Sequence, residues 1–473
     1  MEEKTIASSR RAHCLVLAFP AQGHINPMIQ FSKLLVHEGV KVTLCTTRSF
    51  IKKLQNLPSS MSLESISDGF DNGFEQAGSH KAYLEKFLQV GPQTLLELLD
   101  NLSQLGNPVD CIIYDSFMPW VLDIARKHGI FGASYLTQNM SVNSIYYHVQ
   151  LGKIKVPLSD NEVDGILLPA MPKLQKGDLP SFFFSYEEEP TQLKLLVDQF
   201  SNIDKVDWIL CNSIYELDKE IAEWTTKIWP KFRTIGPNIP SMILDNRIKN
   251  DQDYDIAQFK TEDSCIDWLD NKPKWSVIYV SFGSMVPLNE EQMEEIAYGL
   301  RDSDNYFLWV VRASEENKLP KDFAKKSEKG LIVTWCAQLK VLQHEAIACF
   351  VTHCGWNSTL KTLSIGVPTI AMPQWSDQAT NAKYIVDVWK VGIRAPYYDD
   401  DNDKKKIVKR DALKKCIVEM MDGEKGNEMR KNAIQLKKLI LEAASVGGSS
   451  HRNILEFVKS LEGSTCPGFE ITP

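Results

Sequence analysis

The sequence predicts an α/β protein made of two doubly wound, Rossmann-like domains that face each other across a cleft. The chain has 473 residues, and a single hydrophobic core stops growing near about 250–300 residues, so two domains are expected. Short β-branched runs alternate with segments of helical period, which is typical of parallel sheets covered on both faces. A charge-rich stretch with little apolar periodicity, residues 239–263, separates two such series.

In the first series, the predicted strands are residues 14–19, 40–46, 111–114 and 130–136, and the predicted helices are residues 27–37, 120–128 and 139–151. Asn26 is a favourable N-cap and Pro27 suits the first helical position, so we expect the first helix to begin there. In the second series, the predicted strands are residues 276–282, 306–312, 330–333, 349–352 and 369–372, with helices at 289–300 and 450–461. The run Asp399–Lys406 is expected to be a solvated loop without function.

The composition excludes several classes of protein. Hydrophobic residues make up 43% and charged residues 24%, so neither a disordered nor a fibrous protein is expected. The net charge of −8 disfavours a nucleic-acid surface. No run reaches the roughly 18 apolar residues of a spanning helix, and the first apolar run indicates a strand rather than a signal peptide. We therefore expect a cytoplasmic protein without stable membrane insertion, whose ten cysteines are reduced thiols.

Several ligand-binding motifs are missing from the sequence. It has no Gly-x-Gly-x-x-Gly after a strand, no P-loop and no Gly-x-Ser-x-Gly elbow. Residues 350–358 can still bind phosphate at a helix N-terminus, although the same layout also suits a merely capped helix. Metal binding is disfavoured because the nearby cysteines and histidines lack the usual paired spacing: Cys336, His344, Cys349, His353 and Cys354.

Residues 335–378 read WCAQLKVLQHEAIACFVTHCGWNSTLKTLSIGVPTIAMPQWSDQ. This segment resembles the signature box of plant family-1 UDP-dependent glycosyltransferases, secondary-metabolite glucosyltransferases of GT-B fold. The residues GHINP at 23–27, the strand-end Asp115 and the residues SFGS at 281–284 also fit. The resemblance covers essentially the whole chain and implies a hexosyltransferase.

The resemblance implies a division of the chain into functional parts. Residues 1–240 would bind the acceptor, 241–264 would be a linker, and 265–447 would bind the UDP-sugar. Residues 448–462 would form a helix that returns to the N-terminal domain, and residues 463–473 a loose tail. UDP-glucose would be a co-substrate, with no cofactor and no metal, and the chain is expected to be a monomer.

The resemblance also assigns roles in donor binding. Trp335 would stack on uracil, while the Ala337 main chain and Gln338 would meet the base edge and the ribose. The diphosphate would lie against His353, Gly355, Asn357 and Ser358, with Ser284 assisting from the other loop. Trp356, Asp377 and Gln378 would contact the sugar hydroxyls, a pattern associated with glucose, and Trp375 and Thr137 complete the implied donor site.

The catalytic pair implied by the resemblance is His24 and Asp115. A positioned histidine is a usual general base for an acceptor hydroxyl, and such a base contributes about 10²–10⁴-fold. His24 is expected just ahead of a helix N-terminus, whose dipole disfavours the imidazolium form. Asp115 ends a strand and would orient His24. Direct displacement would invert the donor to a β-glucoside.

One position departs from the family pattern. Where the family has a glutamate that accepts hydrogen bonds from both ribose hydroxyls, this chain has Lys361, which has no acceptor. The alternative hypothesis is therefore a UDP- or metabolite-binding homologue with weak or no transferase activity. A third hypothesis, an epimerase of related fold, fits the signature box poorly. Lys361 could also turn to solvent, with water bridging to the ribose.

The acceptor is the least determined part of the prediction. The resemblance implies a small apolar plant metabolite: a phenol, flavonoid, terpenoid or steroid that offers a hydroxyl or carboxyl group. Aromatic residues could line its pocket or could equally be core. The residues expected at the pocket are Gly23, Trp120, Tyr146 and Phe183.

Overall fold

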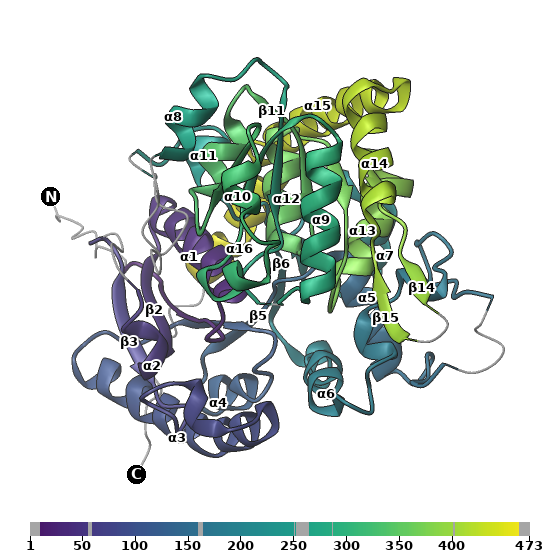
Figure 1. Ribbon diagram of the computed structural model, residues 1–473. Helices are drawn as coiled ribbons and strands as arrows, with labels where there is room; N and C mark the ends of the chain where they lie inside the picture. The colour runs from purple at the N-terminus through teal and green to yellow at the C-terminus, as the bar shows by residue number, and fades with distance from the viewer. Residues whose placement is uncertain are drawn as a thin grey trace, which may run out of the picture.

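The computed structural model describes residues 10–54, 59–158, 164–249, 251, 264–285, 287–400 and 403–462. Two parallel sheets lie side by side, each with helices on both faces (Figure 1). This confirms the predicted fold class. The predicted tail and the central part of the predicted linker lie outside the described residues.

The first sheet has seven parallel strands in the order β3-β2-β1-β4-β5-β6-β7. Its strands are β1 (His13–Leu17), β2 (Lys41–Thr47), β3 (Ser62–Ile66), β4 (Cys111–Asp115), β5 (Phe131–Leu136), β6 (Trp208–Cys211) and β7 (Phe232–Thr234). The helices around it are α1 (Gln22–His37), α2 (Arg48–Ile51), α3 (His80–Gln104), α4 (Val121–Lys127), α5 (Met140–Gln150), α6 (Pro190–Asp198) and α7 (Lys219–Ile228). Alternate β1 side chains enter cores on opposite faces, Cys14 and Val16 in one and Leu15 and Leu17 in the other.

The second sheet has six parallel strands in the order β10-β9-β8-β11-β12-β13. Its strands are β8 (Val277–Ser281), β9 (Tyr306–Val310), β10 (Gly330–Val333), β11 (Ile347–Thr352), β12 (Thr369–Ala371) and β13 (Gly392–Arg394). Its helices are α8 (Ser264–Asp270), α9 (Glu290–Asp302), α10 (Phe323–Lys326), α11 (Gln338–Gln343), α12 (Trp356–Ile365), α13 (Gln378–Lys383), α14 (Arg410–Asp422) and α15 (Glu424–Ala444). As predicted, the Asn289 side chain caps α9, accepting the Gln292 N–H at 2.7 Å.

The predicted start of the first helix is wrong. α1 begins at Gln22 rather than Pro27, because the Ala21 carbonyl already accepts the N–H groups of His24 and Ile25, at 2.9 and 3.0 Å. Pro27 therefore lies inside the helix. His24 is part of the first helical turn instead of preceding it.

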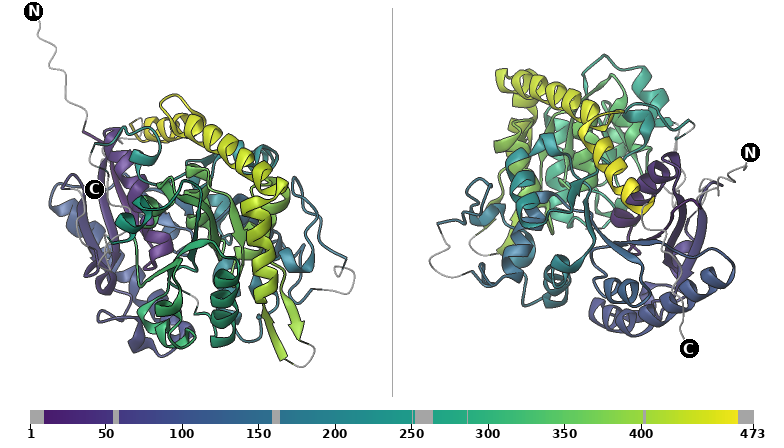
Figure 2. Two further views of the ribbon diagram at one scale, coloured as in Figure 1. Left: turned by 45° about the horizontal axis from the view of Figure 1, so that its top comes forward. Right: turned by 180° about the vertical axis from the view of Figure 1, so that it is seen from behind.

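The last helix, α16 (Ser449–Glu462), crosses back from the second sheet to the first (Figure 2). Its apolar face joins the core beneath β1, where the ring of Phe457 packs edge-on against Trp208 at 5.7 Å. The Ser450 hydroxyl donates to the Gly236 carbonyl at 2.6 Å. The end of the chain therefore ties the second half to the first.

The two halves also contact each other directly. The Arg394 guanidinium lies 2.8 Å from the buried Asp178 carboxylate, and the Ser181 N–H donates to the Ser376 carbonyl at 3.0 Å. These contacts join the connection after β5 to the segment after β12. The loops at the facing ends of the two sheets are thus held against each other.

The predicted loop at residues 399–406 is wrong in part, because it contributes to an antiparallel hairpin of β14 (Tyr398–Asp400) and β15 (Asp403–Ile407). None of the helices in the described ranges is long and apolar enough to cross a membrane. The nine cysteines that the structure describes are buried, and none of them is in a disulfide.

Candidate functional site

The site lies where the strand order reverses in each sheet. In the first sheet this point is between β1 and β4, whose ends are in register through Leu17 and Tyr114. In the second it is between β8 and β11, where Ser281 lies opposite Thr352. Doubly wound sheets bind ligands beyond the carboxyl ends of strands at such reversals. The loops that follow these four strands are therefore the candidate site.

His24 and Asp115 meet at the first reversal. The His24 Nδ1 atom lies 2.7 Å from Asp115 Oδ2, and Asp115 is fully buried. The other carboxylate oxygen accepts the Phe117 N–H at 3.0 Å, which fixes the carboxylate plane. With Nδ1 donating to the carboxylate, Nε2 of a neutral imidazole is the atom that can accept a proton. Thr137, which follows β5, lies 3.4 Å from the same Nδ1 through its hydroxyl.

Aromatic rings surround His24 on the side of the first domain. The ring centroids of Phe117 and Phe19 lie 4.5 and 5.5 Å from the imidazole. Phe87 lies next to Phe19 and also contacts Trp120, at 5.9 Å between centroids. These contacts make the immediate surroundings of the histidine apolar.

The predicted acceptor residues separate into two groups. Trp120 belongs to the aromatic group near His24, whereas Tyr146 and Phe183 are buried, and their rings pack 6.4 Å apart in the core. Tyr146 and Phe183 therefore lie in the core, which was one of the two positions expected for these aromatic residues. Sequence reasoning missed Phe19 and Phe117, although both follow the ends of reversal strands, which was the available signal.

At the second reversal, the His353 ring lies between two glycines. A Cβ atom on Gly283 would lie 2.9 Å from the ring and one on Gly355 only 2.5 Å from Nε2, so neither position has room for a side chain. Gly283 also has φ of +74°. Burial lowers the pKa of His353 to about 4, partly opposed by a hydrogen bond to the Ser281 main chain. His353 is therefore a neutral hydrogen-bonding group at pH 7.

The N-terminus of α12 points from this reversal toward α1. Gly355 is its N-cap, and Asn357 donates from Nδ2 to the Gly23 carbonyl at 2.7 Å. The Ser284 hydroxyl makes a longer contact of 3.4 Å to Gln22 Oε1. Two predicted diphosphate residues thus reach the turn that carries His24. Ser358 lies half-buried in the same first turn of α12.

Sequence reasoning also missed Arg312, which follows β9. Its guanidinium donates to the Ser284 carbonyl at 2.7 Å and pairs with Glu315 at 2.7 Å. The positive charge of Arg312 also contributes to the lowered pKa of His353. Arg312 therefore stabilises the loop after β8 through its hydrogen bond to Ser284. Its guanidinium also places a positive charge near the candidate phosphate site.

Trp356 lies differently from the prediction. Its indole N–H donates to the Asn212 carbonyl of the first domain at 2.7 Å, and the side chain is 5% exposed. The ring belongs to a core shared by both halves. The indole N–H is therefore committed to domain packing rather than to a sugar hydroxyl. The main-chain N–H of Trp356, at the first position of α12, remains at the helix end.

Asp377 and Gln378 are buried between the two halves. Burial raises the pKa of Asp377 to about 6, although the Asn381 amide donates to its carboxylate at 2.7 Å. A positive charge on His24 would lower the pKa of Asp377, so the two side chains lie within electrostatic reach of each other. The Gln378 side-chain oxygen accepts hydrogen bonds from the main-chain N–H groups of Gln374 and Trp375. The side-chain NH₂ group is therefore the part of Gln378 that can donate to a ligand.

The remaining predicted donor residues lie around the start of α11. Trp335 is half-buried in the segment after β10, Ala337 is the N-cap of α11, and Gln338 is the first helical residue. Lys361 reaches Gln338 from α12, with 3.1 Å between Nζ and Oε1, and is 5% exposed. Lys361 therefore points into the predicted ribose region, and the alternative in which it turns to solvent is wrong.

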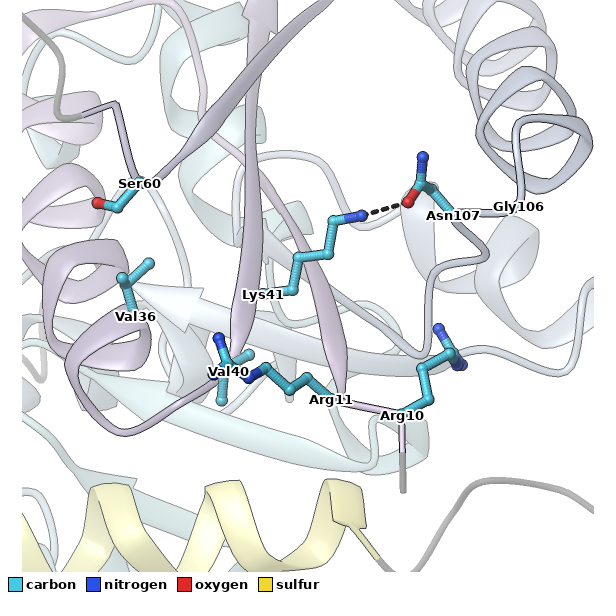
Figure 3. Close-up of a pocket in the computed structure, with 8 residues that line it drawn as sticks. All are labelled: Arg10, Arg11, Val36, Val40, Lys41, Ser60, Gly106 and Asn107. Carbon is cyan, nitrogen blue, oxygen red and sulfur yellow. Dashed lines mark hydrogen bonds between the residues drawn. The ribbon is translucent and has the colours of Figure 1, made fainter. Parts of the chain in front are cut away.

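A separate cavity of about 430 Å³ lies at the opposite end of the first sheet, among residues that precede β1, begin β2 or precede β4 (Figure 3). Arg10 pairs there with Asp110, and Lys41 donates to the Asn107 side chain. The cavity lies at the amino ends of the strands, whereas His24 and Asp115 follow the carboxyl ends. It is therefore not part of the candidate site. Its lining comprises Arg10, Arg11, Val36, Val40, Lys41, Ser60, Gly106 and Asn107.

Comparison with known proteins gives a consistent result. Residues 257–433 match the family described as UDP-glucoronosyl and UDP-glucosyl transferase. Mogroside I-E synthase of Siraitia grosvenorii is 43% identical over 95% of this chain and 98% of its own. Flavonol 7-O-beta-glucosyltransferase UGT74F1 of Arabidopsis thaliana is also 43% identical, over 96% of this chain and 99% of its own.

The fold is also shared with a solved structure. Os79 from O. sativa in complex with UDP superposes with a TM-score of 0.88, at 36% identity, over 95% of this chain and 100% of that chain. Os79 has also been solved in complex with U2F and trichothecene. The same two-sheet architecture thus binds UDP and a small molecule in a related protein.

Proposed function

The chain belongs to the plant family-1 UDP-glycosyltransferases, and from this premise we propose that it transfers glucose from UDP-glucose to a hydroxyl or carboxyl group of a small apolar metabolite. The reaction inverts the anomeric carbon. The observation that carries this proposal is the 2.7 Å contact between His24 Nδ1 and the buried Asp115, which leaves Nε2 to accept a proton. The alternative of a binding protein has no support from the relatives, which are named for synthesis or transfer.

In the proposed reaction, His24 acts as the general base. Nε2 takes the acceptor proton as the acceptor oxygen bonds to the anomeric carbon, and the bond from that carbon to the diphosphate breaks. The imidazolium that forms is stabilised by the Asp115 carboxylate 2.7 Å away. Because a single displacement occurs on the face opposite the leaving group, the product is a β-glucoside.

The leaving UDP would be stabilised by main-chain donors, by the neutral His353 and by the charge of Arg312, with no metal. The α12 N-terminus supplies main-chain N–H groups beside Gly355, and the glycines around His353 let a diphosphate approach the backbone closely. His353 contributes a hydrogen bond and no charge, since its pKa is about 4. The field of Arg312, beside the Ser284 loop, adds to the stabilisation of the phosphate charge.

The sugar and the acceptor are assigned from the surroundings of His24. Asp377 and the amide of Gln378 would bind the glucose hydroxyls, because both lie between the halves near the base. The rings of Phe19, Phe117 and Trp120 would cover an apolar acceptor. A flavonol glucosyltransferase among the relatives supports a phenolic hydroxyl as one class of acceptor.

The experiment is a screen of aglycones with UDP-glucose, read by mass spectrometry as a gain of one hexose. The panel contains phenols, flavonoids, terpenoid and steroid alcohols, and carboxylic acids, with UDP-galactose and UDP-glucuronic acid as competing donors. We expect UDP-glucose to be the preferred donor and apolar acceptors to be glucosylated. Retention of the α-configuration in the product, or preference for another UDP-sugar, would contradict the proposal.

A further inference from the structure

Pro27 is a part of the GHINP motif to which the proposed mechanism gives no role. It lies in the second turn of α1, where proline is normally unfavourable, because it removes a hydrogen bond and its ring crowds the carbonyl four residues earlier. That carbonyl belongs to Gly23, which directly precedes the proposed base. The hydrogen bond that the proline removes is therefore missing from the helical turn that carries His24.

The Gly23 carbonyl has a partner in the second domain. In an α-helix it would accept the N–H of residue 27, and proline has no N–H. Instead, Asn357 Nδ2 donates to it at 2.7 Å. Asn357 is the second residue of α12, whose N-terminus forms part of the proposed diphosphate site. The missing helical bond is thus replaced by a bond between domains.

A second contact lies beside the first. The Ser284 hydroxyl, from the loop after β8, approaches Gln22 Oε1 at 3.4 Å. Residues 22 and 23 therefore contact both loops of the second reversal, and His24 is the next residue in the chain. α1 lies on the side of the first sheet that faces the second domain (Figure 1).

We propose that Pro27 is a positioning residue, which keeps the Gly23 carbonyl available to Asn357 and so holds the base-bearing turn in register with the diphosphate site. The proposal goes beyond the proposed function, because it concerns how the two sites are aligned rather than the reaction that they perform. A residue that restores the N–H at position 27 returns the Gly23 carbonyl to the helix. The N–H of residue 27 then competes with Asn357 for the same carbonyl and weakens the bond between the domains.

The test is a double-mutant cycle with Pro27→Ala and Asn357→Ala, read by calorimetric UDP titration and by kcat and KM for UDP-glucose. We expect Pro27→Ala to fold with an equal or higher Tm, because alanine is the better helix former, and yet to weaken UDP binding about 3- to 10-fold. In the Asn357→Ala background, the same proline change should have no effect on UDP affinity. This non-additivity is a signature that a merely structural proline does not produce.

Pro92→Ala is the matched control, because Pro92 also lies inside a helix, α3, which packs against β3, α4 and α6 of the first domain. It should leave UDP affinity unchanged. The proposal is overturned if Pro27→Ala leaves UDP affinity within 1.5-fold, or weakens it equally with and without Asn357. It is also overturned if neither Pro27→Ala nor Pro27→Ser folds, since the proline then serves folding.

The titration separates this inference from the proposed function. UDP binding requires no turnover, so a chain that binds UDP with the expected coupling but glucosylates no acceptor supports the inference and contradicts the proposed function. A chain that glucosylates acceptors without the coupling does the reverse.

Discussion

The reversals of the two sheets occupy the same place in the same fold, and they carry opposite chemistry. The first holds an ionisable pair, His24 and the fully buried Asp115, 2.7 Å apart among aromatic rings. The second holds a neutral histidine, His353, pressed between two glycines at the start of a helix. The first arrangement suits the proposed proton transfer, whereas the second suits the proposed approach of the diphosphate to the backbone.

The difference shows what a fold does and does not decide. Strand order puts both loops at the carboxyl ends of their sheets and turns them toward each other. The residues in the loops decide the chemistry, since a carboxylate partner makes one histidine a base and burial without a carboxylate makes the other a neutral donor. Variants of the two sites are predicted to affect turnover and UDP affinity to different extents.

The largest expected effect is that of His24→Ala. Loss of the base should lower kcat for an alcohol acceptor by about 10²–10⁴-fold, while UDP affinity stays within about threefold, because the donor site is on the other sheet. The measurement is steady-state kinetics together with UDP titration.

An acidic acceptor is the control for this variant. A carboxylic acid or an acidic phenol arrives ionised and needs no base, so its turnover should fall much less. Equal loss for acidic and alcohol acceptors, or no loss for either, would contradict the role of His24.

The next effect is that of Gly355→Ala at the second reversal. The new Cβ would lie 2.5 Å from His353 Nε2, so ring or backbone must shift in a well-packed loop. Overpacking costs about 1–3 kcal/mol, and we expect UDP affinity to fall about 10- to 100-fold. Gly177→Ala, where no atom lies within 4 Å of the new Cβ, is the control. Unchanged UDP binding by Gly355→Ala would show that the diphosphate does not lie against this loop.

A smaller effect is expected from Lys361→Glu. The lysine donates to Gln338 at 3.1 Å and offers no acceptor to a ribose hydroxyl. A glutamate regains acceptor oxygens, and we expect UDP affinity to rise about 10-fold. Lys361→Met, of similar length, separates the loss of the ammonium from the gain of the carboxylate. Affinity that stays within twofold in Lys361→Glu would rule out a ribose contact at this position.

The smallest effect is a pH dependence that belongs to Asp377. Burial raises its pKa to about 6, so the folded state holds a proton that the unfolded chain has released between about pH 4 and 6. Folding stability from this group therefore falls as pH rises through that window. The carboxylate needed to accept from a sugar hydroxyl is lost below pH 6.

We expect KM for UDP-glucose to rise about fourfold from pH 7 to 5.5, as a single group of pKa about 6 requires. Affinity for UDP, which lacks the sugar, should change less over the same range. In Asp377→Asn the KM should be independent of pH, and a persistent fourfold change there would assign the titration to another group.

Local patterns predicted much of the fold, whereas the resemblance supplied the residues of the candidate site. The β-branched runs of β1, β4, β8 and β11 were predicted within a few residues. Asp115 ends β4, and His24, Ser284 and His353 follow the other three strands at the reversals. α3 is not among the predicted helices, although Leu95, Leu98, Leu99 and Leu102 form a buried stripe of helical period along it. Strands as short as β7, with three residues, leave no periodic signal to find.

The sequence by itself determined the alternation of strands and helices, and with it the parallel sheets and their reversals, because period and propensity act over a few neighbouring residues. Only the tertiary structure decided where α1 begins, which rings surround His24, and that the Trp356 indole pairs with Asn212 rather than facing a sugar. Those outcomes depend on partners far away in the chain, such as Gly23 and Asn357, which meet only after both domains have folded. Such pairings produce no periodic pattern in the sequence. Which groups are buried, and which hydrogen bonds they form, depends on the residues that the folded chain places next to them.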